Sequence, residues 1–100
     1  MLKDKYRFKL QADDAYLLHT QIQEVYNRYG YAKDLEVKLP LAVLMDFQKR
    51  LIAALLFPEK EIKIYLKRTE ALAFQLLYMG NMIDTTYQTI QVAHAIDVTL

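Results

Sequence analysis

Three segments of this chain alternate apolar with polar side chains, and a stretch with helical spacing follows each one. The segments read Tyr6-Arg-Phe-Lys-Leu10, Leu35-Glu-Val-Lys-Leu39 and Ile62-Lys-Ile-Tyr-Leu66. Alternation with a period of two is typical of a strand that buries one face. The pattern therefore predicts strands over about 5–10, 34–39 and 61–67.

The segments between these strands carry apolar residues three and four positions apart, which predicts helices. The first helix is expected to begin near Asp13 or Asp14, which suit a helix N-terminus, and to stop at Gly30. The second is expected over about 41–57, between Pro40 and Pro58. The third is expected over about 70–79, with Gly80 as its stop.

The C-terminal segment, 81–100, has two interpretations. Ile90, Val92, His94 and Ile96 alternate with other residues, and this pattern favours a fourth strand over the last ten or so positions. A helical interpretation stays open, because Ile83, Tyr87, Ile90 and His94 are spaced four, three and four apart.

Together these elements predict a two-layer α/β or α+β fold, β-α-β-α-β-α with a fourth C-terminal strand and the helices on one face of a small parallel sheet. We expect one domain, 1–100, built from an internal strand–helix repeat of about 28 residues (5–30, 34–57 and 61–80) and the segment 81–100. The expected core combines inward residues of strands and helices: Phe8, Leu18, Ile22, Val37, Leu44, Leu51, Ile64 and Leu76.

Composition narrows the classes of protein further. The formal net charge is only +1, so no strong overall field attracts nucleic acid or anionic membranes. The absence of cysteine removes disulfides and thiolate chemistry. The N-terminus lacks the apolar region of a secretory signal, and the longest apolar runs fall far short of the roughly 20 residues of a membrane span. We therefore expect a soluble, cytoplasmic protein with no membrane contact.

Catalytic chemistry has few candidates in this sequence. His19 and His94 are the two imidazoles, and each lies beside apolar residues, which favours a structural role over a general base. Asp13 and Asp14 are adjacent and do not share a helix face, so they favour a helix cap over a metal site. No turn between a strand and a helix is rich in glycine, as a phosphate cradle requires. The sequence predicts neither an enzyme nor a cofactor or metal site.

The outward positions of the predicted strands are mostly basic. An aromatic side chain among bases on a sheet is how some proteins bind single-stranded RNA. A nucleic-acid-binding module is therefore the alternative hypothesis, with weak and salt-sensitive binding expected and a merely solvated charged face as the simpler interpretation. Its candidate residues are Lys5, Arg7, Lys9, Lys38, Lys63, Tyr65 and Lys67.

The leading hypothesis rests on an excess of apolar residues in the second and third helices. A helix on one side of a two-layer domain needs one apolar stripe, and these two carry more. We expect a small non-enzymatic interaction protein that forms a homo-oligomer, preferably a dimer, or binds another protein. The competing explanation is that the segment after Gly80 folds back over the third helix. The candidate interface residues are Phe47, Leu55, Leu56, Phe74, Leu77 and Tyr78.

Overall fold

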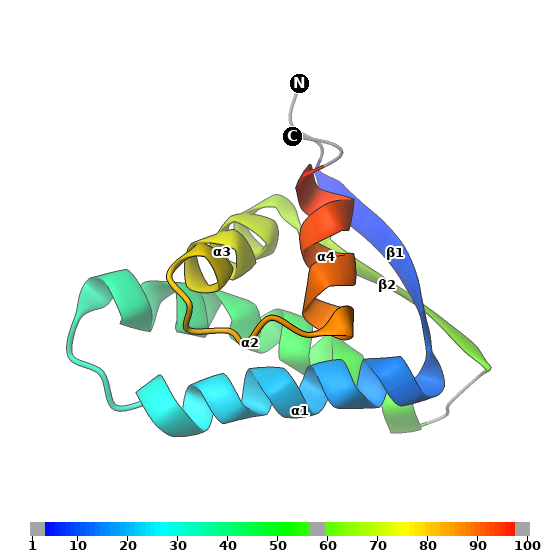
Figure 1. The fold of residues 1–100 in the computed structure, drawn as a ribbon, viewed down its shortest axis with the longest axis horizontal. Coiled ribbons are helices and arrows are strands. Elements are labelled where there is room, and N and C mark those ends of the chain that lie inside the picture. The colour runs from blue at the N-terminus through cyan, green and yellow to red at the C-terminus, as the bar shows by residue number, and fades with distance from the viewer. Residues whose placement is uncertain (1–3, 57–59, 98–100) are drawn as a thin grey trace.

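The computed structural model describes residues 4–56 and 60–97 and has an α+β fold, four helices and two strands in this part of the chain. Figure 1 shows their arrangement. In chain order the elements are β1 (Lys5–Gln11), α1 (Ala12–Tyr29), α2 (Leu35–Leu56), β2 (Glu61–Lys67), α3 (Arg68–Met79) and α4 (Tyr87–Asp97).

The two strands form an antiparallel ribbon, and their predicted positions are confirmed. Phe8 pairs with Ile64 at its centre, and Lys5 and Gln11 pair with Lys67 and Glu61 at its ends. Alternation places one set of side chains on the inner face, as the sequence predicts. That inner set is Tyr6, Phe8, Leu10, Ile62, Ile64 and Leu66, all buried or partly buried.

The predicted strand at 34–39 is wrong, because this segment is the first turn and a half of α2. Asp34 precedes the helix and caps it: its carboxylate accepts a hydrogen bond from the Glu36 N–H at 3.0 Å. Its carbonyl oxygen accepts the N–H groups of Val37 and Lys38. Alternation over five residues also satisfies the i, i+4 spacing of a helix. The hydrogen bonds of Asp34 favour the helix over the strand.

The loss of that strand also changes the direction of the sheet. A single helix between two strands returns the chain to its start and gives a parallel pair. Here two helices, α1 and α2, lie between the strands and pack side by side, so the chain enters β2 running opposite to β1. The predicted parallel sheet is therefore replaced by one antiparallel ribbon.

The predicted C-terminal strand is also wrong, because 87–97 forms helix α4. Thr86 and Thr89 cap its start reciprocally, each hydroxyl oxygen accepting the other residue's N–H. Val92 and Ile96, four positions apart, face the core. The helical interpretation thus holds, with a different buried face, since Tyr87, Ile90 and His94 are exposed. Residues 98–100 of the predicted strand lie outside the described residues.

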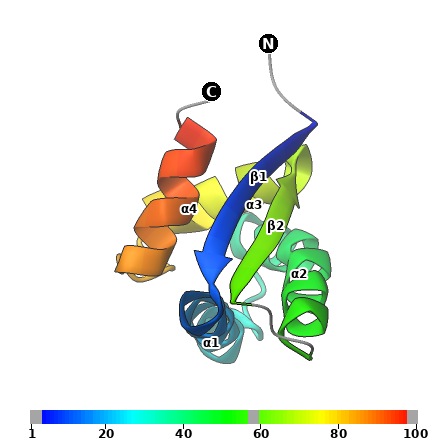
Figure 2. The same ribbon diagram turned by 90° about the vertical axis from the view of Figure 1, so that its right-hand side faces the viewer.

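The helices enclose the core on the inner side of the ribbon. Figure 2 shows α4 alongside β1, α2 alongside β2, α3 behind the ribbon and α1 below it, at the end of β1. Of the expected core, Leu18, Ile22, Leu44, Leu51 and Ile64 are buried, and Phe8 and Val37 are partly buried against them. Leu76 is the exception at 62% exposed, because α4 covers a different side of α3.

Candidate functional site

The outer face of the ribbon gathers basic side chains from both strands. We call this surface the ribbon face and define it by the outward residues Lys5, Arg7, Lys9, Gln11, Glu61, Lys63, Tyr65 and Lys67. All of them are exposed except the half-buried Tyr65. The register sets Lys5 opposite Lys67 and Lys9 opposite Lys63. Like charges that face each other across a strand pair destabilise it, so this arrangement carries a cost to the fold.

A shallow hollow of about 440 Å³ lies at the centre of the ribbon. It is lined by Arg7, Phe8, Lys9, Lys63, Ile64 and Tyr65. Glu61 is the acid of the ribbon face, and its carboxylate lies 3.8 Å from the Lys9 Nζ, with both side chains largely exposed. A pair this exposed contributes little. The ribbon face therefore keeps a strong excess of positive charge.

Tyr65, the aromatic residue of the ribbon face, is already engaged by two cations. The Arg50 guanidinium lies 4.4 Å from its ring centroid and the Lys5 ammonium 4.7 Å. Both distances are within the range of cation–π attraction. These contacts tie the Tyr65 ring to β1 through Lys5 and to α2 through Arg50.

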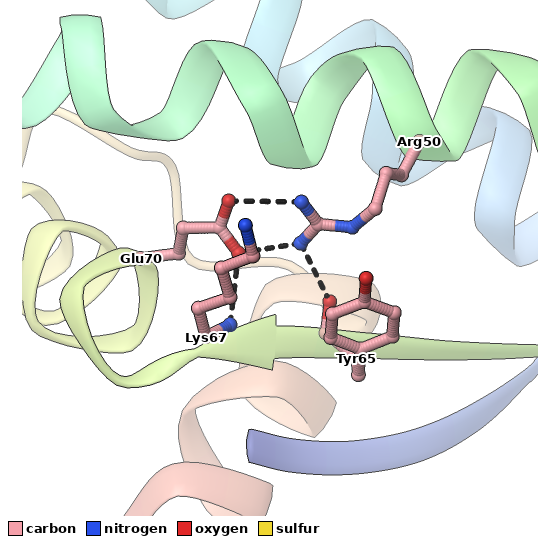
Figure 3. A network of polar contacts seen from close by, with 4 residues as sticks. All are labelled: Arg50, Tyr65, Lys67 and Glu70. Carbon is pink, nitrogen blue, oxygen red and sulfur yellow. Dashed lines mark hydrogen bonds and ion pairs between the residues drawn. The ribbon is translucent and has the colours of Figure 1, made fainter. Parts of the chain in front are cut away.

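Arg50 belongs to a polar cluster that joins α2, β2 and α3, shown in Figure 3. Its Nη1 donates to one Glu70 carboxylate oxygen at 3.0 Å, and its Nη2 donates to the other and to the Tyr65 carbonyl oxygen. The Lys67 N–H also donates to Glu70, at 2.8 Å. The hydrogen bond to Glu70 raises the pKa of Arg50. Both Glu70 oxygens and both terminal nitrogens of Arg50 are bonded within the protein, whereas the buried Arg50 Nε has no hydrogen-bond partner among the described residues. Because the charges are paired with each other, we interpret the cluster as structural.

The outer side of α2 presents a second candidate surface. We call it the α2 outer stripe and define it by Leu35, Leu39, Ala42, Asp46, Lys49, Ala53 and Leu56, which follow one another at spacings of four and three. Met45 and Ile52 flank it. Exposure of the large apolar residues in the stripe and beside it ranges from 42% for Ile52 to 68% for Leu56. Figure 2 shows no other element over the outer side of α2.

The structure places the sequence-predicted interface residues mostly inside the single chain. Phe47, Phe74 and Leu77 are fully buried, and Tyr78 is partly buried with its ring stacked 5.8 Å from that of Phe74. Leu55 is also partly buried, which leaves Leu56 exposed. The apolar surface open to a partner therefore includes other residues of α2, namely Leu35, Leu39, Met45 and Ile52, and exposed residues of α1, α3 and α4.

The wrong strand prediction at 34–39 explains why the sequence analysis misplaces Lys38 and does not include Leu35 and Leu39 in the interface. Because 34–39 is expected to be a strand, Lys38 is assigned to the basic face, but α2 carries it to a separate hollow beside Gly30 at the end of α1. The same assignment places Leu35 and Leu39 on the inner face of a strand, so the sequence analysis does not count them among the interface residues. Their spacing of four, continued at Ala42, is the signal of a helix face. The other predicted nucleic-acid residues do lie together on the ribbon face.

The two histidines differ in their exposure. His94 is exposed, whereas the sequence suggests a core position. His19 is half-buried, and Gln48 donates to its carbonyl oxygen at 3.0 Å. Across residues 4–56 and 60–97, no three histidine or carboxylate side chains gather in a way that could hold a metal ion.

Comparisons with protein-family models, with curated proteins and with solved structures gave no match. Within the described part of the chain, no helix is long and apolar enough to cross a membrane. The described residues form a small α+β protein with two exposed features, a helix face of mostly apolar residues around Asp46 and Lys49 and a basic two-stranded ribbon.

Proposed function

We propose that this chain is a non-enzymatic interaction protein that self-associates through the α2 outer stripe. The observation that carries the proposal is the continuity of the stripe along all of α2. Single exposed apolar side chains are normal, but contiguous ones mark interaction sites. Alternating spacings of three and four are also the pattern by which two helices pack along a common seam.

The sequence of the stripe is complementary to itself when two copies run antiparallel. With a two-fold axis between positions 47 and 48, Leu39 faces Leu56 of the partner subunit and Ala42 faces the partner's Ala53. Asp46 then faces the partner's Lys49, and the symmetry repeats each pair. The small alanine side chains allow the two helices to approach each other near the centre, and the leucine pairs pack at both ends.

The charges favour this antiparallel alignment over a parallel one. In a parallel pair, Asp46 would face its own copy and so would Lys49, which places like charges together. Within the described residues neither side chain forms an ion pair inside the chain. Both are exposed and available to a partner.

A shorter apolar stripe on α3 is the matched comparison. The competing explanation from sequence, a fold-back of the C-terminal segment over the third helix, describes part of what α4 does, since it packs against α3. Leu72, Leu76 and Met79 nevertheless stay exposed at spacings of four and three. This stripe spans about two turns, whereas the α2 outer stripe spans six.

Sedimentation at tens of micromolar tests the proposal directly. The expected mass is about twice the 11.8 kDa of the chain. Leu39→Glu should give a folded monomer, because it places a carboxylate against the partner's Leu56. Leu76→Glu, an equally exposed leucine on α3, should leave the dimer intact. A monomeric wild type refutes self-association, and dissociation by Leu76→Glu alone moves the interface to α3.

A charge exchange tests the antiparallel alignment. Asp46→Lys alone should weaken the dimer about tenfold, because symmetry turns two attractive pairs into two repulsive ones, each change being worth roughly 0.5–1 kcal/mol. Lys49→Asp alone should do the same. The two changes together should restore dimerisation, since the pairs re-form with exchanged partners. Failure of the double variant to recover excludes this register, while Lys63→Glu on the ribbon face serves as the control.

A further inference from the structure

We propose that the ribbon face binds the phosphate backbone of duplex nucleic acid without reading its sequence. This inference is independent of dimerisation. It rests on the juxtaposition of Lys5, Arg7, Lys9, Lys63 and Lys67 on one uncovered sheet face, two pairs of them in direct cross-strand opposition. In Figure 2 the outer side of the ribbon faces the viewer, and no helix lies over it: α2 and α4 lie beside it, α3 behind it and α1 below it.

The spacing of the charges fits an extended anion better than a small one. Outward residues on one strand are about 7 Å apart, and the two strands are about 4.8 Å apart. The pair Lys5 and Lys67 is therefore roughly 13 Å from the pair Lys9 and Lys63. A single phosphate would reach one end of this array. A chain of phosphates can contact both ends at once and relieve both repulsive pairs.

The distribution of charge over the molecule points the same way. The ribbon face carries five basic residues against one acid, whereas the whole chain has a formal net charge of +1. The remainder of the protein is therefore slightly acidic, and the positive charge is concentrated on one side. Such segregation orients a protein toward a polyanion without giving the whole chain a strong field.

Nucleic acid fits this surface better than an anionic membrane does. Proteins that bind membrane surfaces combine basic residues with apolar side chains that enter the lipid. The outward residues of the ribbon include no exposed large apolar side chain, and Tyr65 is half-buried. The hollow at its centre is lined by Arg7, Lys9 and Lys63 and also by Phe8, Ile64 and Tyr65. These last three are buried or half-buried, so the exposed side chains there are the three cations, which present charge to a backbone rather than an apolar side chain to a bilayer.

The contacts of the Tyr65 ring favour binding of a duplex over binding of a single strand. Proteins that hold single strands stack bases on free aromatic rings. Here Arg50 and Lys5 already lie against the Tyr65 ring, and Arg50 is itself fixed by both oxygens of Glu70. Contacts with phosphates need only the exposed cations, and they carry no base sequence.

Fluorescence anisotropy with a labelled 20-base-pair DNA of arbitrary sequence tests the inference, with salt varied from 50 to 200 mM. Four to five phosphate contacts predict a slope of about −4 in a plot of log affinity against log salt concentration. A second duplex of different sequence should bind within about twofold. The double variant Lys9→Glu, Lys63→Glu should bind at least about tenfold more weakly, with the slope reduced by about two.

The control is Lys33→Glu, Lys38→Glu, which makes the same change in net charge on exposed residues away from the ribbon. It should bind within about threefold of the wild type. An equal loss in the control overturns the proposal, because bulk charge and not the ribbon face would then explain binding. So does tighter binding of a matching single strand, or binding only to vesicles with anionic lipids.

A neutral variant separates binding from folding. Lys9→Gln, Lys63→Gln removes one repulsive pair without adding charge, so the melting temperature should stay the same or rise. Binding to the duplex should still fall about three- to tenfold. Unchanged affinity in this folded variant overturns the proposal.

Discussion

Arg50 and Glu70 show how a single pair of side chains fixes three elements. Glu70 is 2% exposed and its carboxylate is held by Arg50 and by the Lys67 N–H at the start of α3. The Arg50 guanidinium also donates to the Tyr65 carbonyl oxygen and lies over the Tyr65 ring. The position of Tyr65 at the edge of the ribbon face thus depends on a contact with α2.

Removal of Arg50 should be costly, because it leaves a buried carboxylate without its partner. Arg50→Met is expected to destabilise the protein by about 3–5 kcal/mol in urea unfolding. The double variant Arg50→Met, Glu70→Met should be more stable than Arg50→Met alone, since no buried charge remains unpaired. A double variant that is less stable than the single one would contradict this account.

Tyr26 links stability to alkaline pH. Its hydroxyl donates to the Leu41 carbonyl oxygen, and burial, with a smaller effect of Asp46, raises the pKa of Tyr26 from 10.0 to about 12. The folded state therefore favours the neutral phenol. Its contribution to stability is complete below pH 10 and is lost as the pH rises from about 10 through 12.

The comparison with Tyr26→Phe isolates this effect from other groups that titrate at high pH. The free energy of unfolding of the wild type, relative to that of Tyr26→Phe, should fall between pH 10 and 12 and stay level from pH 7 to 9. Urea unfolding at each pH measures the difference. A constant difference across the range would show that Tyr26 ionises equally in both states.

At the scale of elements, the first turns of α2 are the instructive case. Five residues of alternation cannot distinguish a strand from a helix, because Leu35 and Leu39 share a face in both. Asp34 provides the deciding contact by capping the N–H of Glu36. Acidic residues commonly precede both helices and turns, so the presence of Asp34 in the sequence does not show that a helix begins after it.

Asp34→Ala should therefore destabilise the protein by about 1 kcal/mol, as the loss of a helix cap does. The neighbouring Lys33→Ala should change stability by less than about 0.5 kcal/mol, because Lys33 is exposed and precedes the helix. Thermal or urea unfolding of both variants gives the comparison. Equal effects would indicate that the Asp34 carboxylate does not cap α2.

The positions of the two strands follow from their alternation of apolar and polar residues. The inward residues Tyr6, Leu10, Ile62 and Leu66 are all buried, as their periodicity predicts. The C-terminal segment was harder, since Val92 and Ile96 fit both the alternation of a strand and the four-residue spacing of a helix. The Thr86–Thr89 cap, which is a contact between side chains and backbone, settles the matter in the structure.

At the scale of the whole molecule, the sequence indicates both candidate surfaces and misplaces one of them. The ribbon face follows from period-two alternation alone, so six of its seven expected residues lie together. The apolar excess of the second and third helices is real, but composition cannot say which side of a helix the core uses. Phe47 turns inward on α2, which packs against α1 and α3, and Phe74 and Leu77 turn inward on α3, which packs against α2 and α4. The residues on the opposite faces of α2 and α3 are the ones that stay exposed.

The pairing of β1 with β2 also determines the order in which the fold can be completed. Gln11 pairs with Glu61, so the whole helical hairpin of α1 and α2 lies inside the loop that this pairing closes. On the ribosome, β1 emerges first and has no partner until residue 67 has been made. The entropy of loop closure grows slowly with length, so the delay adds little to the equilibrium cost. It does make ribbon closure a late, non-local step, while the hairpin of α1 and α2 forms from contacts nearer in sequence. During that interval Tyr6, Phe8 and Leu10 expose an unpaired apolar edge, and a neighbouring nascent chain can offer its own β2 in exchange.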